Sequence, residues 1–242
     1  MNWHTRYSQQ AKWTRDLRHY IFEKVGIKHA QDVLEVGCGT GAILSDLPKQ
    51  PNVYGLDINL DSLLECHIHA PVAILTQGDA LQLPYFDQSF NIVYCHFLLL
   101  WVTDPLQALL EMQRVAKNGG YVLAFAEPNY LRRVDQPEEL IQLGKWQTEA
   151  LVRQGADPAL GARLAELFYE AGIQIIETGT IQSQGREPSS EEWEIEWDVI
   201  ESDLKGWVAE NNIQEIKQLD KQARVHKTRL LHVPTHFAWG RV

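Results

Sequence analysis

Short apolar segments alternate with amphipathic ones along most of the chain, a pattern typical of a parallel sheet whose strands are joined by helices. The apolar segments are the expected strands, and they lie at residues 32–36, 53–56, 73–77, 90–95, 121–126 and 173–178. The fourth, Phe90–Cys95, is almost wholly apolar, as expected of a strand that is buried on both faces. The pattern therefore predicts a doubly wound α/β fold.

Segments with helical periodicity or helix-boundary residues separate these strands. They lie at residues 8–24, 40–47, 60–69, 106–115, 138–153 and 160–171. Pro48 is expected to end the second of them, and the pair Asp104-Pro105 is expected to begin the fourth. Residues 186–230 are also expected to be mainly helical, and residues 231–239 are expected to return as a final, antiparallel strand.

The composition limits the partners that the chain can have. Its 242 residues suffice for one large α/β domain. The formal net charge is -10, with an acidic excess at residues 187–203, whereas a surface that binds nucleic acid needs the opposite charge. The basic residues within 221–229 have no interleaved aromatic side chains, so no nucleic-acid partner is expected.

No segment has the length and apolar character of a membrane span. The longest clearly apolar run, residues 97–102, is too short to cross a bilayer, and residues 1–10 are polar. We therefore expect a cytoplasmic protein with no membrane partner.

The cysteines and histidines do not indicate a metal site. Cys38, Cys66 and Cys95 have neither disulfide-framework nor zinc-ligand spacing. Three further histidines are close in sequence but lack an identifiable carboxylate partner, namely His226, His232 and His236. Metal-independent chemistry is therefore expected.

Three glycines follow the first expected strand, in the run Val33–Gly41. Such a turn lets a ligand lie against bare backbone. The spacing is G-x-G-x-G, whereas dinucleotide-binding loops have G-x-G-x-x-G. Carboxylates follow at the ends of the next two strands, Asp57 after the second and Asp79 after the third. This is the edge of the sheet at which open α/β folds bind ligands.

In this order and spacing, the glycine loop and the two acidic strand ends resemble the class I S-adenosylmethionine-dependent methyltransferases. The resemblance covers about residues 30–180 and extends to Gly78–Phe86 and Phe90–Val93. It implies an α/β fold with a seven-stranded, mostly parallel sheet in the order 3-2-1-4-5-7-6 and a C-terminal helical insertion. The 242 residues would form a single domain whose parts are a helical lid at 1–29, a cofactor-binding core at 30–182, a substrate cap at 183–230 and a final strand at 231–242.

The resemblance also implies which residues surround the cofactor, S-adenosylmethionine. They are Glu35, Gly37, Cys38, Gly39, Gly41, Asp57, Ile58, Asp79, Ala80 and His96. Glu35 would interact with the ammonium group, and Asp57 would accept hydrogen bonds from both ribose hydroxyls. Asp79 and the Ala80 N–H would recognise adenine, while Ile58 would pack on one of its faces.

The acceptor half of the site is less defined by the sequence. His96 immediately follows the fourth strand, and the ordinary histidine pKa near 6.5 suits proton removal; lining the cofactor pocket is an equally open role for it. Trp101, Glu127 and Tyr130 are candidates for contact with the acceptor. The alternative for Glu127 is a purely structural turn, and for the aromatic residues it is ordinary packing.

The segment His96–Leu99 lacks the motif of nucleobase-methylating relatives, and residues 95–101 lack the acidic ligands of the metal-dependent catechol group. The expected function is therefore methyl transfer to a small-molecule acceptor. Two alternatives remain open: a cofactor-binding protein without transferase activity, and an NAD(P)-dependent oxidoreductase, against which the glycine spacing argues.

Overall fold

The computed structural model describes residues 3–48, 51–181 and 188–242, and it is built around one seven-stranded sheet. The strands run in the order β3-β2-β1-β4-β5-β9-β7. Their bounds are β1 (Asp32–Val36), β2 (Asn52–Asp57), β3 (Ile74–Gln77), β4 (Phe90–Cys95), β5 (Ala116–Pro128), β7 (Gln174–Ile181) and β9 (Thr235–Arg241). Strand β9 is antiparallel to both of its neighbours, and the other pairs are parallel. Numbered within this sheet alone, the order is 3-2-1-4-5-7-6, so the prediction is confirmed.

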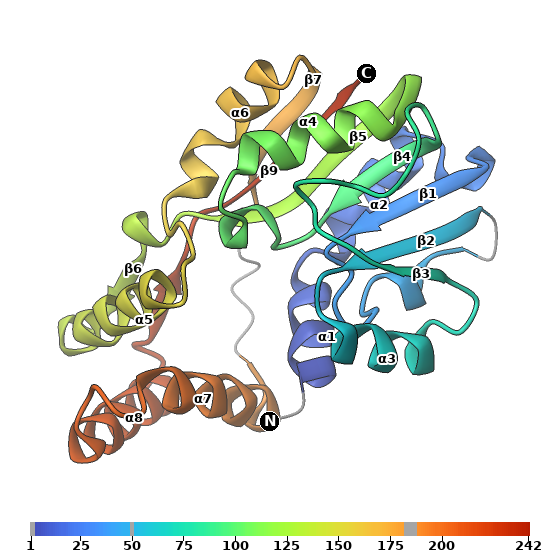
Figure 1. The fold of residues 1–242 in the computed structure, drawn as a ribbon. Coiled ribbons are helices and arrows are strands. Elements are labelled where there is room, and N and C mark those ends of the chain that lie inside the picture. Colours follow the sequence, from blue (N-terminus) through green and yellow to red (C-terminus); the bar gives the residue numbers. More distant parts are fainter. Residues whose placement is uncertain (1–2, 49–50, 182–187) are drawn as a thin grey trace.

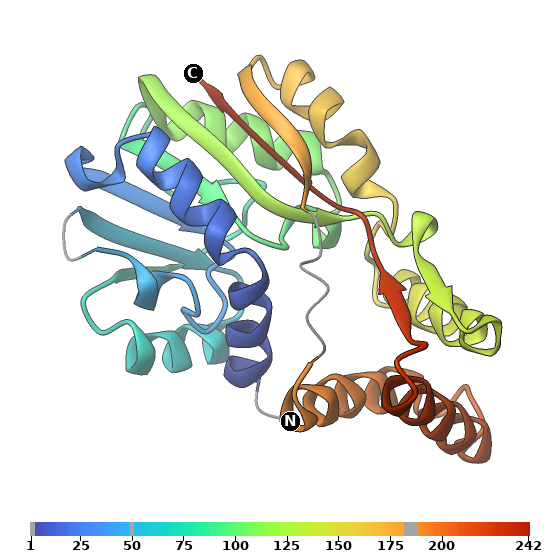
Figure 2. The ribbon, with the colours of Figure 1, turned by 180° about the vertical axis from the view of Figure 1, so that it is seen from behind.

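The described part of the chain contains eight α-helices. They are α1 (Trp3–Trp13), α2 (Arg15–Lys24), α3 (Leu60–His69), α4 (Pro105–Val115), α5 (Ile141–Arg153), α6 (Leu164–Glu170), α7 (Ser190–Leu204) and α8 (Glu210–Val225). Helices α4 and α6 cover one face of the sheet and α2 covers the other, as the opposite views of Figures 1 and 2 show. Asp104 caps α4 by accepting a hydrogen bond from the Gln107 N–H, and Pro105 occupies the first turn, as expected.

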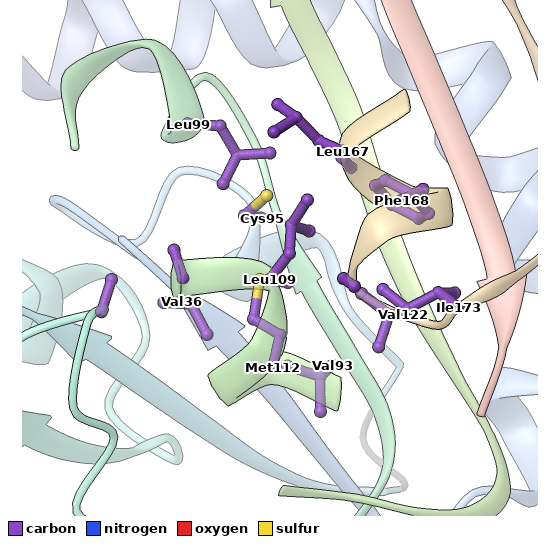
Figure 3. Close-up of a cluster of buried hydrophobic side chains, with 14 of the residues drawn as sticks. Val36, Val93, Cys95, Leu99, Leu109, Met112, Val122, Leu167, Phe168 and Ile173 are labelled. Carbon is purple, nitrogen blue, oxygen red and sulfur yellow. The ribbon is translucent and has the colours of Figure 1, made fainter. Parts of the chain in front are cut away.

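The two faces of the sheet bury separate apolar cores because successive side chains of a strand point to opposite sides. Figure 3 shows the first core, in which Val93 and Val122 of the sheet meet Leu109 of α4 and Phe168 of α6. On the other face, Ile21 and Phe22 of α2 belong to a cluster with Tyr94 and Phe125. No described helix is long and apolar enough to cross a membrane.

Three expected elements differ from those observed. Residues 40–47 form only a short 3-10 turn at Leu44–Asp46, preceded by Gly41 at a φ of +79°. The expected helix at 8–24 is divided at the buried Thr14, which separates α1 from α2. The expected final strand at 231–239 is divided as well: β8 (Leu230–His232) pairs with β6 (Val134–Gln136) in a second sheet, and β9 begins only at Thr235.

The expected C-terminal helical insertion is present as α7 and α8, which lie apart from the main sheet beside α5 (Figure 1). Its first residues, up to 187, lie outside the described part of the chain. The helices share an apolar cluster with α5 that includes Trp193, Trp197 and Leu143. Helix α7 also meets α1, because the Gln9 side chain donates a hydrogen bond to the Glu192 carbonyl at 3.1 Å. The N-terminal and C-terminal helices are therefore in direct contact.

Candidate functional site

The glycine loop, which directly follows β1, is held against the end of β2. The N–H groups of Gly37 and Cys38 both donate to the Leu56 carbonyl, at 2.7 and 2.9 Å. Gly37 has a φ of +74°, and a methyl group added there would lie 2.7 Å from Leu98. Glycine is therefore required at this position by the backbone and by the close approach of a neighbouring side chain.

Asp57 ends β2 directly beside this loop. One of its carboxylate oxygens accepts a hydrogen bond from the Gly39 N–H at 2.8 Å, and the other accepts one from the Asn59 N–H at 2.9 Å. The side chain is only partly buried. Since a carboxylate offers about four lone-pair directions, Asp57 retains capacity for donors from a ligand while the loop fixes its orientation.

The end of β3 lies next to Asp57 and brings a second carboxylate to the same edge. The Gly78 N–H donates to the Asp57 carbonyl at 3.1 Å. Asp79 is exposed, and one of its oxygens accepts from the Leu81 N–H at 2.9 Å. Ile58 is 68% exposed and offers an apolar surface beside Asp57. This edge therefore combines acceptors with an apolar face, as a nucleoside requires.

Helix α1 lies over the glycine loop, within the segment 1–29 that the resemblance implies to be a helical lid, although helical periodicity alone predicts a helix only from residue 8 onward. A methyl group at Gly39 would lie 3.2 Å from the Tyr7 ring. Burial and the Asp57 charge raise the pKa of Tyr7. The His4 Nδ1 lies 2.9 Å from the Thr40 hydroxyl. The N-terminal helix therefore contributes side chains to the site.

Two residues predicted to contact the cofactor are enclosed by protein. Glu35 is 3% exposed and accepts a hydrogen bond from the Tyr94 hydroxyl at 3.0 Å. Burial raises its pKa well above the ordinary value. Cys38 is buried beside Cys66, and Cys95 is buried in the sheet. Neither Glu35 nor Cys38 is presented at the open edge, so contact with the cofactor's ammonium group has no support from this geometry.

His96 follows β4, as expected, but its environment differs from the one that a base needs. Its Nε2 lies 2.9 Å from the Thr14 hydroxyl, which also accepts a hydrogen bond from Arg18 at 2.6 Å. The Thr14 hydroxyl also donates to the Ala11 carbonyl at 3.3 Å. Burial and the Arg18 charge hold the pKa of His96 well below its ordinary value. The expectation of an ordinary pKa is therefore wrong, because the sequence did not place Arg18 nearby.

Glu127 is enclosed by the backbone of the turn after β4 and, contrary to expectation, does not face an acceptor. It is 0% exposed. One carboxyl oxygen accepts from the Leu98 and Leu99 N–H groups at 3.1 and 3.0 Å, and the other accepts from the Leu100 N–H at 3.1 Å. Burial outweighs these donors and raises its pKa to about 8. Glu127 thus fixes the turn after β4, and its location in the fold does not bring it to a ligand.

Replacing Glu127 by glutamine is expected to lower the free energy of unfolding by about 1 to 3 kcal/mol, because the amide NH2 group would face the Leu100 N–H. The folded pKa of about 8 exceeds the ordinary 4.5, so the carboxyl's contribution is complete below pH 4.5 and is lost as pH rises through 8. Urea unfolding from pH 5 to 9 should show that the difference in unfolding free energy between wild type and Glu127→Gln, the stability gap, narrows as pH rises. Glu170→Gln, at an exposed site, is the control; a gap that widens with pH would contradict this account.

The remaining predicted acceptor residues lie on turns after β4 and β5. Trp101 is exposed and Tyr130 is partly buried. Asn129, which directly precedes Tyr130, is a further candidate that the sequence pattern did not single out. It is 6% exposed, and its side-chain oxygen has no hydrogen-bond partner among the described residues. A buried unpaired acceptor at a strand end is a candidate for bonding to a ligand.

Comparison with known proteins connects this geometry to a family. Residues 34–124 match the model of the family described as "Methyltransferase domain". The demethylmenaquinone methyltransferase of Lactobacillus johnsonii is 33% identical over 162 residues, which are 63% of this chain and 64% of that protein. The chain spans about half to two thirds of the length of the curated relatives it matches.

Solved structures show the same fold at low sequence identity. A protein from Anabaena variabilis, provisionally assigned as a methyltransferase of antibiotic biosynthesis, superimposes with a TM-score of 0.68 at 13% identity and covers 94% of this chain and 97% of its own. The [4+2]-cyclase SpnF superimposes with a TM-score of 0.59 at 17% identity, over 93% and 80% of the two chains. The chain is thus similar to methyltransferases over residues 34–124, and its strand order and overall fold agree with those of the solved structures.

Proposed function

We propose that this protein transfers the methyl group of S-adenosylmethionine to a small-molecule acceptor without a catalytic metal ion. The observation that carries the proposal is Asp57, whose carboxylate is fixed by the Gly39 N–H and still has lone pairs to offer at the open edge of the sheet. A ribose diol supplies the two hydroxyl donors that such a carboxylate accepts.

The residues present fit the cofactor. Asp57 would hold the ribose, Ile58 would cover one face of adenine, and Asp79 with the Ala80 N–H would bind its polar edge. The amino-acid portion would lie against the backbone of the glycine loop. S-adenosylmethionine supplies an activated methyl group on its sulfonium, so the protein's main task is to align the acceptor and exclude water.

We further propose that α1 and α7 together enclose the acceptor as lid and cap. Their contact through Gln9 supports this arrangement, and so does the position of Tyr7 over the glycine loop. Trp101, Tyr130 and the unpaired Asn129 oxygen would line the acceptor side. The relatives named demethylmenaquinone methyltransferase make a quinol a reasonable first acceptor to assay, alongside phenols, amines and carboxylic acids.

Calorimetric titration with S-adenosylmethionine, S-adenosylhomocysteine and NAD tests the cofactor directly. We expect binding of the first two and none of NAD. Release of S-adenosylhomocysteine in the presence of an acceptor panel then tests transfer. Binding of NAD alone would contradict the proposal and favour the oxidoreductase.

A second candidate is a protein that binds S-adenosylmethionine without transferring its methyl group. It is favoured by one observation, the similarity of the fold to a structure named as a [4+2]-cyclase. Tight cofactor binding with no S-adenosylhomocysteine release from any member of the acceptor panel would support this candidate over methyl transfer.

His96→Ala is expected to lower turnover by less than about tenfold, whereas loss of a general base costs about 100- to 10,000-fold. The reason is that a histidine with a lowered pKa, already bonded to Thr14, is a weak base. Turnover is measured with an acceptor identified above, and the cofactor affinity serves as the folding control. A loss above 100-fold, with the acidic limb of the pH profile also removed, would restore His96 as the base.

A further inference from the structure

Three side chains with metal-binding groups meet beside the glycine loop, at the contact between α1 and α3. They are His4 of α1 and Glu65 and His69 of α3, and one ligand atom from each lies within 4.8 Å of the others. The rings of His4 and His69 are stacked, with centroids 3.4 Å apart and planes 7° apart. The His69 Nε2 lies 3.9 Å from a Glu65 carboxylate oxygen.

We propose that His4, Glu65 and His69 form a site for a divalent transition-metal ion such as Zn²⁺, and that the ion fastens helix α1 over the glycine loop. Two imidazoles and one carboxylate are a donor set that Zn²⁺ accepts, with water as the fourth ligand. Mg²⁺ and Ca²⁺ prefer oxygen ligands, so this site would discriminate against them.

The three residues are placed so that an ion can reach them. Glu65 and His69 are four residues apart on α3 and therefore lie on one face of that helix. Glu65 and His4 are partly buried and His69 is exposed, so the site opens to solvent. In a tetrahedral site with bonds of about 2.1 Å, ligand atoms lie about 3.4 Å apart. Side-chain rotation must therefore draw the ligand atoms, which now lie up to 4.8 Å apart, together by as much as about 1.4 Å. It must also unstack the His4 and His69 rings so that a lone pair of each faces the ion.

The surroundings of His4 favour its use as a ligand. Its Nδ1 lies 2.9 Å from the Thr40 hydroxyl, an outer-shell contact that orients the ring. Its Nε2 is the atom left to bind the ion. This atom now lies 3.3 Å from the Ser8 hydroxyl, in a weak contact that metal binding would break.

The site is linked through the chain to the proposed cofactor site, and this part of the inference rests on the proposed function. Thr40 follows Gly39, whose N–H is held by Asp57. An ion that fixes His4 against Thr40 would therefore fix the lid and the loop in one arrangement. We expect Zn²⁺ to tighten binding of S-adenosylhomocysteine by about three- to tenfold, since a preordered lid reduces the ordering cost of binding.

The test uses the full chain without a polyhistidine tag, because a tag would bind the ion. Zn²⁺ is titrated in competition with a chromophoric chelator. We expect one ion per chain, with affinity reduced at least about tenfold by His4→Ala and by His69→Ala. His67→Ala is the matched control, since His67 lies on the same helix, is exposed and is not in the cluster. Circular dichroism confirms that the variants fold.

Two results would overturn the metal site: Zn²⁺ binding that is equal in wild type and His4→Ala, or a loss in His67→Ala as large as in His69→Ala. Titration with Co²⁺ separates this site from the buried thiols Cys38 and Cys66. Histidine and carboxylate ligands give weak visible bands, whereas thiolates add intense near-ultraviolet charge-transfer bands, and their appearance would also overturn the proposal. Zn²⁺ binding is read without any cofactor, so its failure is distinct from failure of the methyltransferase assignment.

Discussion

Replacing Asp57 by alanine is expected to weaken binding of S-adenosylmethionine by about 1 to 3 kcal/mol, or roughly 5- to 150-fold. The substitution removes the acceptor proposed for the ribose hydroxyls. It also removes the partner of the Gly39 N–H at 2.8 Å and of the Asn59 N–H at 2.9 Å, so the loop loses its anchor. Calorimetric titration measures the change in dissociation constant.

The matched control for this substitution is Asp61→Ala. Asp61 is an exposed carboxylate in the first turn of α3, close to Asp57 in sequence. It should leave the affinity within about twofold of wild type because exposed charges contribute little. Equal affinities of wild type and Asp57→Ala would remove the main support for the proposed cofactor site.

Asp220→Ala is expected to lower the free energy of unfolding of the α7–α8 region by about 3 to 5 kcal/mol. One Asp220 oxygen accepts from the Trp193 and Trp197 indoles at 2.6 and 3.0 Å and from Arg224 at 3.0 Å. The other accepts from Arg229 at 2.7 Å. The Arg229 side chain is only 2% exposed. The substitution removes one of its carboxylate partners and therefore leaves a buried cation partly uncompensated.

Urea unfolding followed by tryptophan fluorescence measures this effect, because two of the indoles bond to Asp220 itself. Asp198→Ala, at an exposed position of α7, is the control and should change stability by less than about 0.5 kcal/mol. Arg229 also contacts Asp135 at 2.7 Å, which keeps the cation partly paired in the variant. A loss below about 1 kcal/mol would show that this network does not hold the cap.

The same carboxylate predicts the acid sensitivity of the cap. Burial alone raises the pKa of Asp220, but the Trp193 N–H, the Arg224 charge and the remaining donors outweigh it and lower the pKa below its ordinary value. A lowered folded pKa means that the contribution is present above the ordinary value near 3.8 and is lost as pH falls through the folded pKa. The Asp220→Ala variant should not show this loss of stability at acid pH, because it has no carboxylate at position 220 to protonate.

The central strands could be predicted from the sequence because burial on both faces makes them short, nearly continuous apolar runs. Phe90–Cys95 is observed at its predicted bounds. The glycine loop and Asp57 could be predicted as well, since a tight turn after a strand needs glycine and leaves a local signal. These features depend on neighbours in sequence.

The features that were missed depend on residues distant in sequence. Strand β6 pairs with β8, almost a hundred residues later, and its three residues carry no alternation of their own. Glu127 was placed correctly at a strand end, but only the fold shows that the Leu98–Leu100 backbone encloses it. The lowered pKa of His96 likewise follows from its burial and from Arg18, which belongs to a helix that packs against the sheet.

A crystal structure with S-adenosylhomocysteine bound tests the central claim most directly. The account predicts both ribose hydroxyls within hydrogen-bond distance of the Asp57 carboxylate, adenine between Ile58 and Asp79, and the sulfur near the glycine loop. A nucleoside bound elsewhere on the chain, with Asp57 contacting only Gly39 and Asn59 as in the present structure, would contradict it.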